Sequence, residues 1–459
     1  MTSFEKQSTL PFPTGFVFDW HECPGAFARL TPPWERVELI SQTGGIRDGD
    51  RVELRVSVGP FWKRWVAEHR DYQAGQQFRD VQIQGPFAKW DHTHIVSQTD
   101  DRVSVLLDRI EYRLPFGLLG RLFGSRLTQR KLNRVFAYRH RTTRDDLHAH
   151  WKFQMMTPKP LRILVTGSSG LVGSNLIPFL TGGGHTVCRL VRSKNQTGDD
   201  ALYWNPKSGE VDAGSLEGFD AVVHLAGENI ASGRWTQARK ARIRDSRVEG
   251  TRLLAEALAS LKNPPKVLVC ASAIGYYGDR GDEELTEQSP PGEGFLSDVC
   301  QEWEAAANPA REAGIRVAHM RFGVILSPRD GALKKMLLPF KMGVGGILGN
   351  GRQYWSWIGI DDVIGSIHHA IGTESLEGPV NAVSPQPVTN REFTKTLGRV
   401  LKRPTIFPMP GFVAKTLLGE MAEALLLSSA RVLPNRLMET NYEFRHSNLE
   451  DCLRHLLGR

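Results

Sequence analysis

The stretch ILVTGSSGLVGSNLIPFL, residues 163–180, constrains the fold of this chain more than any other segment. An apolar run typical of a buried strand leads directly into Gly167, Gly170 and Gly173, and an apolar helical segment follows. Glycines at these places allow a tight turn, close approach of the backbone to a ligand, and close packing of a helix on the strand. A helix that begins there presents free N–H groups to an anion, so the stretch predicts a dinucleotide phosphate site.

The segments after this turn alternate between strand and helix. Residues 245–261 have helical spacing. Further strands are expected at residues 186–193, 220–228, 266–273 and 316–326. Such alternation builds a parallel sheet with right-handed crossovers, so we predict a Rossmann-type, doubly wound α/β domain over residues 161–400. A proline-rich segment near residue 400 precedes a mostly helical remainder, predicted to be a small helical C-terminal domain over residues 401–459.

The residues after the second strand indicate which cofactor binds. NAD sites usually carry an acidic residue there, which bonds the ribose 2′-hydroxyl. This chain instead has Arg192, Ser193 and Lys194, and its first acid is Asp199. Two cations and a hydroxyl suit a 2′-phosphate, so we predict NADP (NADPH) as the cofactor. The alternative is that Arg192 and Lys194 are simply exposed loop charges.

The region before the glycine turn has a different pattern. At 459 residues the chain has room for two or three domains. Residues 51–58 alternate polar and apolar side chains, as a half-buried antiparallel strand does, and residues 78–85 and 101–112 continue the pattern. Helical spacing follows and ends near Leu147, and residues 155–160 resemble a linker. We predict an α+β domain over residues 1–155, with a sheet wrapped around its terminal helix.

Apolar runs, the N-terminal segment and the cysteines indicate the cellular compartment. No apolar run approaches the ~20 residues that cross a bilayer, and the N-terminus does not have the pattern of a signal peptide. The five cysteines form no CxxC pair, so we expect no disulfide framework, no metal site and a reducing cytoplasm.

One segment is strongly basic. Residues 109–144 hold ten Arg and Lys residues against one acid. Such a run could bind nucleic acid or an anionic membrane surface. We favour a solvated helix face, because aromatic side chains suited to base stacking are not interleaved with the cations.

The N-terminal region resembles a known fold family. The segments FDWHECPGAFARLTPPW, GPFAKWDHTH and DRIEYRLPFG are similar to polyketide-cyclase and START-like helix-grip proteins, over roughly residues 10–150. The resemblance implies a cavity for an apolar ligand between sheet and helix. The tryptophans that could line it are Trp20, Trp34, Trp62, Trp65 and Trp90. Alternatively, these side chains form an ordinary core.

From Leu161 to the C-terminus the chain resembles the extended short-chain dehydrogenase/reductases, in TGSSGLVG, FDAVVHLAGEN, RVEGTRLLAEAL, VCASAIGYYGD and GNGRQYWSWIGIDDV. The motifs LAGENI, DSR and WEAAA narrow this to an atypical branch of epimerase-family proteins and NADP-dependent oxidoreductases, which end in a domain of unknown function. The implied cofactor contacts are Gly167, Gly170, Leu171, Val172, Gly173, Arg192, Ser193, Leu225, Ala226 and Gly227, and Ser272 matches the family's catalytic serine or threonine.

The chain departs from this family at the catalytic positions. Leu296 stands where the family has a general acid/base Tyr, and Cys300 stands where it has the partnering Lys. Arg247 replaces an active-site Asn, and Trp355 replaces an Arg that grips a nucleotide diphosphate. Ordinary sugar-nucleotide epimerisation is therefore not expected.

Other residues could supply the chemistry. We predict Ser272 and Tyr277 (or its neighbour Tyr276) as proton donors and Arg247 as a cation that stabilises negative charge and contacts the cofactor. Trp355 and Trp357 would form an apolar substrate edge. The function predicted is an NADP(H)-dependent oxidoreductase acting on a small apolar molecule. The alternatives are a non-catalytic NADPH sensor or scaffold, and a lipid or polyketide carrier that works through its N-terminal domain.

Overall fold

The computed structural model describes residues 1–231 and 233–459. The chain divides into two compact units. The first comprises Met1–Gln154, Pro178–Gly184 and Gly458, and the second comprises Met155–Ile177, His185–Leu457 and Arg459. No helix in the described part of the chain combines the length and apolar character that crossing a bilayer requires.

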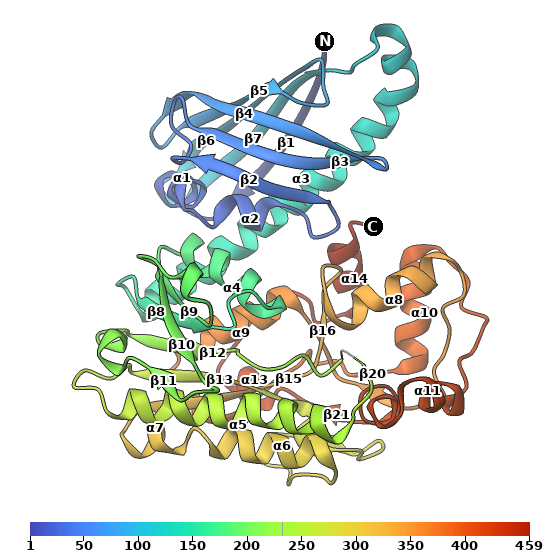
Figure 1. The fold of residues 1–459 in the computed structure, drawn as a ribbon. Coiled ribbons are helices and arrows are strands. Elements are labelled where there is room, and N and C mark those ends of the chain that lie inside the picture. The colour runs from blue at the N-terminus through green and yellow to red at the C-terminus, as the bar shows by residue number, and fades with distance from the viewer. Residues whose placement is uncertain (232) are drawn as a thin grey trace. The chain divides into compact units, whose positions relative to one another are not determined.

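The first unit is built on one antiparallel sheet of seven strands, in the order β1-β7-β6-β5-β4-β3-β2 (Figure 1). Its strands are β1 (Thr2–Leu10), β2 (Val37–Thr43), β3 (Arg51–Val58), β4 (Phe61–Gln73), β5 (Gln77–Gln84), β6 (Lys89–Asp100) and β7 (Val103–Arg113). Its helices are α1 (Thr14–Glu22), α2 (Ala26–Leu30) and the 40-residue α3 (Gly117–Met156). Helix α3 runs past Leu147, so the predicted helix end was too early and Met155 and Met156 are helical rather than linker.

Alternating side chains fix the core of this unit. Strand β7 buries every second residue from Ser104 to Tyr112. Helix α3 places Phe136 against this face, where its ring lies 5.4 Å from that of Phe4. Trp20 and Trp90 are also buried, whereas Trp62 is 42% exposed and stacks under Arg55, so Trp62 does not line the interior as predicted.

The second unit contains an eight-stranded sheet in the order β11-β10-β9-β8-β12-β13-β15-β19, parallel except for the β10–β11 pair. The strands are β8 (Arg162–Thr166), β9 (Thr186–Val191), β10 (Ala201–Asn205), β11 (Glu210–Val211), β12 (Ala221–His224), β13 (Val267–Ala273), β15 (Arg316–Phe322) and β19 (Gly378–Ala382). This is a Rossmann-like α/β fold, in which the strand order reverses between β8 and β12.

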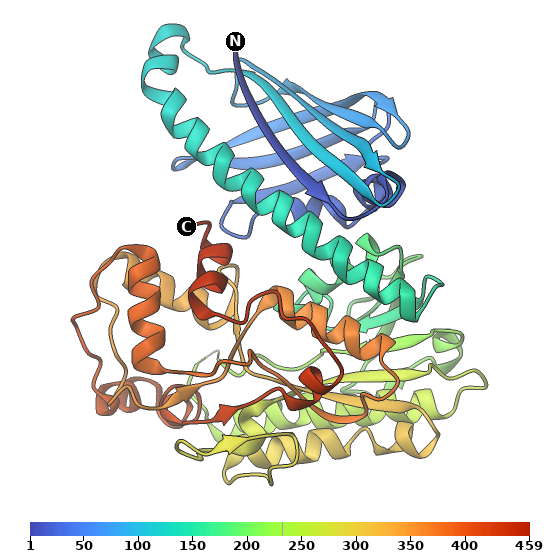
Figure 2. The same cartoon turned by 180° about the vertical axis from the view of Figure 1, so that it is seen from behind.

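Helices cover both faces of this sheet. The helices α5 (Gln237–Ala259), α6 (Phe295–Ala305) and α7 (Asn308–Glu312) lie along one face, and α4 (Leu171–Gly182) and α9 (Ile360–Gly372) lie along the other (Figures 1 and 2). Helix α5 begins eight residues before the predicted start at residue 245, because Thr236 caps it by accepting from the Arg239 N–H. The smaller elements are η1 (Lys194–Gln196), η2 (Ala213–Leu216), η3 (Ile274–Tyr277), β14 (Glu284–Leu285), β16 (Val324–Leu326), α8 (Gly331–Lys341), β17 (Tyr354–Trp355), β18 (Trp357–Gly359), β20 (Val388–Thr389) and α10 (Asn390–Leu401).

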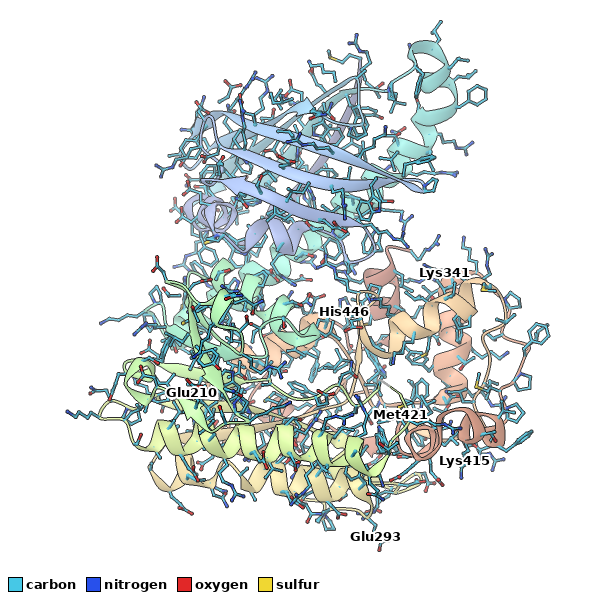
Figure 3. All side chains as sticks on the ribbon, in the orientation of Figure 1. Glu210, Glu293, Lys341, Lys415, Met421 and His446 are labelled. Atoms are coloured by element: carbon cyan, nitrogen blue, oxygen red, sulfur yellow. The ribbon has the colours of Figure 1, made fainter. Side chains whose placement is uncertain are left out.

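The C-terminal segment belongs to the same unit as this sheet. It contains α11 (Gly411–Leu418), α12 (Glu420–Ala422), η4 (Glu423–Leu427), β21 (Arg431–Val432), α13 (Asn435–Glu439) and α14 (Leu449–Leu457). Strand β21 pairs with β14, which lies almost 150 residues earlier in the chain. Met421 is buried, whereas Lys415 is exposed and pairs with Glu423 at 2.8 Å (Figure 3).

Candidate functional site

The glycine turn leaves no room for larger side chains. Gly167 has a φ of +67°, and a Cβ there would lie 2.7 Å from the Leu225 carbonyl carbon. A Cβ on Gly173 would lie 2.4 Å from the Gly167 carbonyl oxygen, whereas one on Gly170 would lie 3.2 Å from the same oxygen. Gly173 is therefore required where the start of α4 packs against the turn, and Gly170 is less constrained by the protein itself.

A buried threonine joins the ends of β8 and β12. The Thr166 hydroxyl oxygen accepts from the N–H groups of Leu225 at 3.0 Å and Ala226 at 3.1 Å. The same hydroxyl bonds His224 Nδ1 at 2.8 Å, and His224 Nε2 bonds the Thr251 hydroxyl at 3.0 Å. Burial lowers the pKa of His224 to about 4, so the ring is neutral near pH 7. This network fixes Leu225 and Ala226 beside the glycine turn.

The predicted 2′-phosphate residues follow β9. Parallel pairing sets Thr166 opposite Leu190, so Arg192 and Ser193 leave the sheet at the same edge as the glycine turn. Arg192 is exposed, and its side chain makes no hydrogen bond or ion pair with any described residue. Lys194 differs, because its ammonium lies 4.8 Å from the Tyr203 ring and 3.7 Å from Glu210. Of the two cations, Arg192 is the one without a protein partner.

Arg247 lies beside the last predicted cofactor residue, Gly227. A Cβ on Gly227 would lie 3.3 Å from the Arg247 guanidinium carbon. The Arg247 side chain donates to the carbonyl oxygens of Glu228 at 3.1 Å and Ile243 at 3.0 Å. Its guanidinium also stacks on Trp303 at 5.0 Å, and burial lowers its pKa. These contacts hold Arg247 in place at the carboxyl edge of β12.

Ser272 is the second-to-last residue of β13, at the same edge of the sheet, and is 3% exposed. Its hydroxyl donates to Glu304 Oε1 of α6 at 2.7 Å. Arg321 of β15 holds both oxygens of this carboxylate, with Nε and Nη2 each at 2.8 Å. The side chain of Glu304 is 14% exposed and that of Arg321 is 3% exposed. Ser272 is therefore oriented by a bidentate ion pair.

Tyr277 is part of the same network but lies in the interior. Its side chain is fully buried, its hydroxyl donates to Asn381 Oδ1 at 2.7 Å, and that hydroxyl accepts from Arg321 Nη1 at 2.9 Å. Burial raises the pKa of Tyr277 to about 12. A proton donor must contact the reacting molecule, so this environment argues against the predicted catalytic role of Tyr277. Tyr276 is closer to the surface, with its ring 3.5 Å from the Arg321 guanidinium.

The positions that replace the family's Tyr and Lys are packed rather than polar. Leu296 lies 3.2 Å from where a Cβ on Gly275 would be, and the Cys300 thiol donates to the Ala273 carbonyl oxygen at 3.6 Å. Burial raises the pKa of Cys300 to about 12, so this thiol does not ionise near pH 7. Neither residue can transfer a proton as a Tyr–Lys pair does.

The predicted apolar substrate edge is not present. Trp357 is fully buried and donates to the Gln386 carbonyl oxygen at 2.9 Å. Trp355 is 5% exposed and packs on Phe393, with ring centroids 5.2 Å apart. The prediction was wrong because β17 and β18 turn both indole rings into the core.

Two family models match parts of this chain, and several known proteins are similar to it. The model of the NAD dependent epimerase/dehydratase family matches residues 163–382, and that of a domain of unknown function (DUF1731) matches residues 409–456. The epimerase family protein Mb2239 of Mycobacterium bovis is 42% identical over 291 residues, which are 63% of this chain and 96% of that protein. The chain belongs to the NAD-dependent epimerase/dehydratase family.

Two solved structures extend the comparison for this epimerase-family protein. A nucleoside-diphosphate sugar epimerase from Corynebacterium glutamicum shares 35% identity with a TM-score of 0.82, covering 99% of this chain and 90% of that one. The human epimerase family protein SDR39U1, crystallised with NADPH, shares 34% identity with a TM-score of 0.60, covering 65% of this chain and 99% of that one. The similarity to the Corynebacterium protein therefore includes both units, whereas the similarity to the human protein extends over 65% of this chain.

Sequence reasoning missed the partners of Ser272. Glu304 lies in the WEAAA motif, and Arg321 lies in the strand expected at residues 316–326. A charged pair within two otherwise apolar segments is the signal that could have revealed them.

Proposed function

We propose that this epimerase-family protein binds NADP(H) in preference to NAD(H). The glycine turn, the Thr166-anchored segment Leu225–Gly227 and Arg192 share one edge of the sheet, at its topological switch point. The observation that carries the proposal is the unpartnered, exposed Arg192, with no acidic side chain in the Arg192–Lys194 segment. The NADPH bound to the human relative supports the same choice.

The test compares NADPH and NADH affinities by calorimetry. We expect NADPH to bind at least tenfold more tightly, a preference of about 1.4 kcal/mol. Arg192→Ala should abolish the preference, because it removes a charge-assisted bond to the phosphate. Lys194→Ala is the matched control and should keep the preference for NADPH, because Lys194 already contacts Tyr203 and Glu210. Equal affinities in the wild type, or equal effects of the two variants, would refute the proposal.

We further propose oxidoreductase chemistry on a small apolar substrate, with Ser272 as the polar group beside the nicotinamide. The bound cofactor would supply or accept a hydride. Ser272 would turn its hydroxyl hydrogen from Glu304 to the reacting oxygen and relay the matching proton between that oxygen and solvent, and the Glu304–Arg321 pair would keep the serine side chain in place. Arg247 would place a positive charge near the cofactor ribose.

A second candidate is a non-catalytic NADPH sensor. The buried state of Tyr277 favours it, since one of the proton donors predicted from the sequence is enclosed by the protein. NADPH oxidation against a panel of aromatic and aliphatic carbonyl compounds separates the two. An enzyme should lose roughly 100- to 10,000-fold in turnover on Ser272→Ala at nearly constant NADPH affinity. No turnover of any compound would favour the sensor.

For the first unit we propose a START-like, helix-grip domain that binds an apolar ligand. Its seven-stranded antiparallel sheet and 40-residue terminal helix support this fold assignment. Native mass spectrometry of the purified full-length chain would test the proposal by revealing a co-purified apolar molecule.

A further inference from the structure

One face of the first unit's sheet carries a group of histidine and aspartate side chains. Cross-strand pairing sets His69 opposite Asp80, Asp80 opposite His92, and His94 opposite Asp108. Residues two apart on a strand share a face, so His92 and His94 point to the same side of β6. Four neighbouring strands, β4 to β7, thus bring five imidazole and carboxylate groups together.

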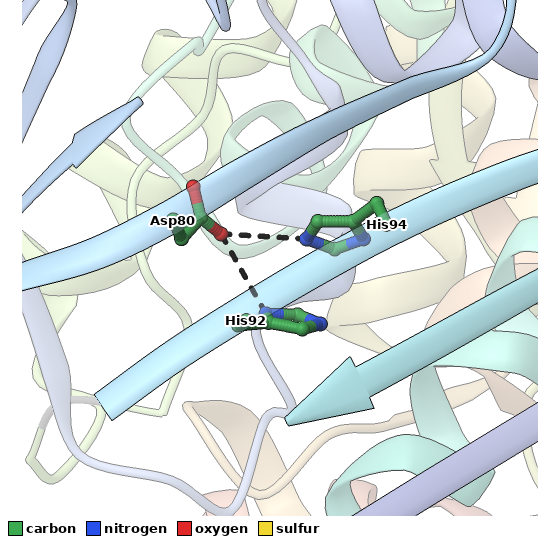
Figure 4. A group of neighbouring side chains, drawn as sticks. All are labelled: Asp80, His92 and His94. Carbon is green, nitrogen blue, oxygen red and sulfur yellow. Dashed lines mark hydrogen bonds and ion pairs between the residues drawn. The ribbon is translucent and has the colours of Figure 1, made fainter. Parts of the chain in front are cut away.

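Three of these side chains present their donor atoms to one point. Asp80 Oδ2 lies 3.3 Å from His94 Nε2 and 3.6 Å from His92 Nδ1 (Figure 4). One donor atom from each of the three side chains lies within 4.8 Å of the other two. The imidazole side chains are 2% and 7% exposed, and that of Asp80 is 23% exposed. The group is therefore nearly enclosed, with access to solvent on the Asp80 side.

Asp108 holds the far side of both rings. Its Oδ1 accepts from His92 Nε2 at 2.8 Å and lies 2.7 Å from His94 Nδ1. Its Oδ2 accepts from His140 Nε2 of α3 at 2.7 Å. A carboxylate only accepts hydrogen bonds, so Nε2 carries the hydrogen of His92. In a neutral ring, the lone pair of His92 Nδ1 then faces Asp80.

The geometry of the donor atoms suits a single bound ion. The Oδ2 atom of Asp80 faces both imidazoles, while its Oδ1 lies 2.7 Å from His69 Nδ1 on the other side. A divalent ion among the three donor atoms would accept electron pairs from all of them. We propose that Asp80, His92 and His94 bind a divalent first-row transition metal, Zn²⁺ or Fe²⁺, and that Asp108 orients the two imidazoles.

The donor set and spacing fit such an ion. Ligands about 2.0–2.1 Å from a tetrahedral zinc lie roughly 3.3–3.5 Å from one another. The two donor distances to Asp80, 3.3 and 3.6 Å, are close to that range. Two histidines and one carboxylate bind both catalytic zinc and non-haem iron(II), and they leave coordination positions open for water or a ligand oxygen. A carboxylate behind metal-bound histidines is the usual second layer of such sites.

The first experiment uses the wild-type full-length chain, free of any affinity tag and stripped with a chelator. Zn²⁺ is titrated against a chromophoric chelator, and Fe²⁺ is titrated without oxygen to distinguish the two ions. We expect about one tightly bound equivalent of one of them. X-ray absorption of the loaded protein should show two imidazoles, further oxygen or nitrogen donors and no sulfur. Absence of a bound equivalent, or a sulfur ligand, would overturn the proposal.

Variants then locate the site. His92→Gln, His94→Gln and Asp80→Asn should each weaken metal binding at least tenfold, and Asp108→Asn should weaken it about 10- to 100-fold as an orienting residue. His455→Gln is the control, because Asp361, His446 and His455 also place three donor atoms within 4.8 Å in the second unit. NADPH affinity should be unchanged in all variants and reports correct folding of the second unit. A loss of metal in His455→Gln but not in His92→Gln would refute the assignment.

Discussion

Replacing Arg321 by methionine should destabilise the second unit far more than breaking a neighbouring surface ion pair. Arg321 makes two hydrogen bonds to Glu304 at 2.8 Å and one to Tyr277 at 2.9 Å, with a side chain that is 3% exposed. Its loss leaves the largely buried Glu304 carboxylate with the Ser272 hydroxyl as donor but without its ion-pair partner, and leaves the buried Tyr277 hydroxyl without the donor it had in Arg321. Removing one partner of a buried pair costs about 3–5 kcal/mol. Glu304 is 14% exposed, so we expect the lower end, about 3 kcal/mol.

The matched control is Arg244→Met. Arg244 pairs with Glu302 on the same helix, α6, at 2.6 Å, but the two side chains are 50% and 40% exposed. Exposed pairs contribute about 0–1 kcal/mol, so this variant should be nearly neutral. Stability is measured by urea unfolding. The transition of the second unit is recognised by its shift to higher urea concentration when NADPH is added, because only this unit is expected to bind the cofactor.

A double-mutant cycle completes the measurement. Glu304→Gln combined with Arg321→Met should recover at least ~1 kcal/mol relative to the sum of the single variants, because no unpaired charge remains. A loss below about 1 kcal/mol in Arg321→Met, or additive single effects, would show that the network around Ser272 does not carry this energy.

Two further predictions concern the cofactor edge. Gly173→Ala should destabilise the fold by about 1–3 kcal/mol, because its Cβ would meet the Gly167 carbonyl oxygen at 2.4 Å. Gly170→Ala should mainly weaken NADPH binding. Equal losses of stability in thermal unfolding, or equal NADPH affinities by calorimetry, would contradict this. The pKa of His224 is about 4 in the fold and about 6.5 in the unfolded chain, so the unfolded chain binds more protons between these two pH values. The stabilisation of the fold by neutral His224 is therefore complete above pH 6.5 and is lost as the pH falls toward 4, by roughly 3 kcal/mol. His224→Gln should make the free energy of unfolding depend less on pH in urea titrations from pH 7.5 to 4.5. An unchanged pH dependence would contradict this prediction.

Local patterns predicted the elements well. The alternation of residues 51–58 matches β3 to the residue, and the glycine turn joins β8 to α4 as expected. Both signals depend only on neighbouring residues, namely side-chain period and the absence of a Cβ. The parallel pairing of the strands in the second unit followed from their alternation with helices.

Long-range contacts account for what the sequence did not reveal. Tyr277 looks like an exposed turn residue after a strand, but its bond to Asn381 spans 104 residues and encloses it. The His–Asp group of the first unit is similar. His92 and His94 reveal a shared face, yet their closeness to Asp80 and Asp108 depends on the order and register of four strands.

The strand β21 makes the C-terminal segment a structural part of the predicted cofactor-binding unit. The Leu433 carbonyl accepts from Asn381 Nδ2 at 3.0 Å, and Asn381 in turn holds the Tyr277 hydroxyl. Ala430 and Val432 pack with Tyr277 and Leu285 in one buried cluster. A protein cut at residue 400 would therefore expose this cluster and remove the Leu433 carbonyl from Asn381, the residue that accepts from the Tyr277 hydroxyl. C-terminal segments exchanged between relatives would have to match the interior around Tyr277. A change that displaced this segment would reach Ser272 through four hydrogen-bonded side chains, those of Asn381, Tyr277, Arg321 and Glu304.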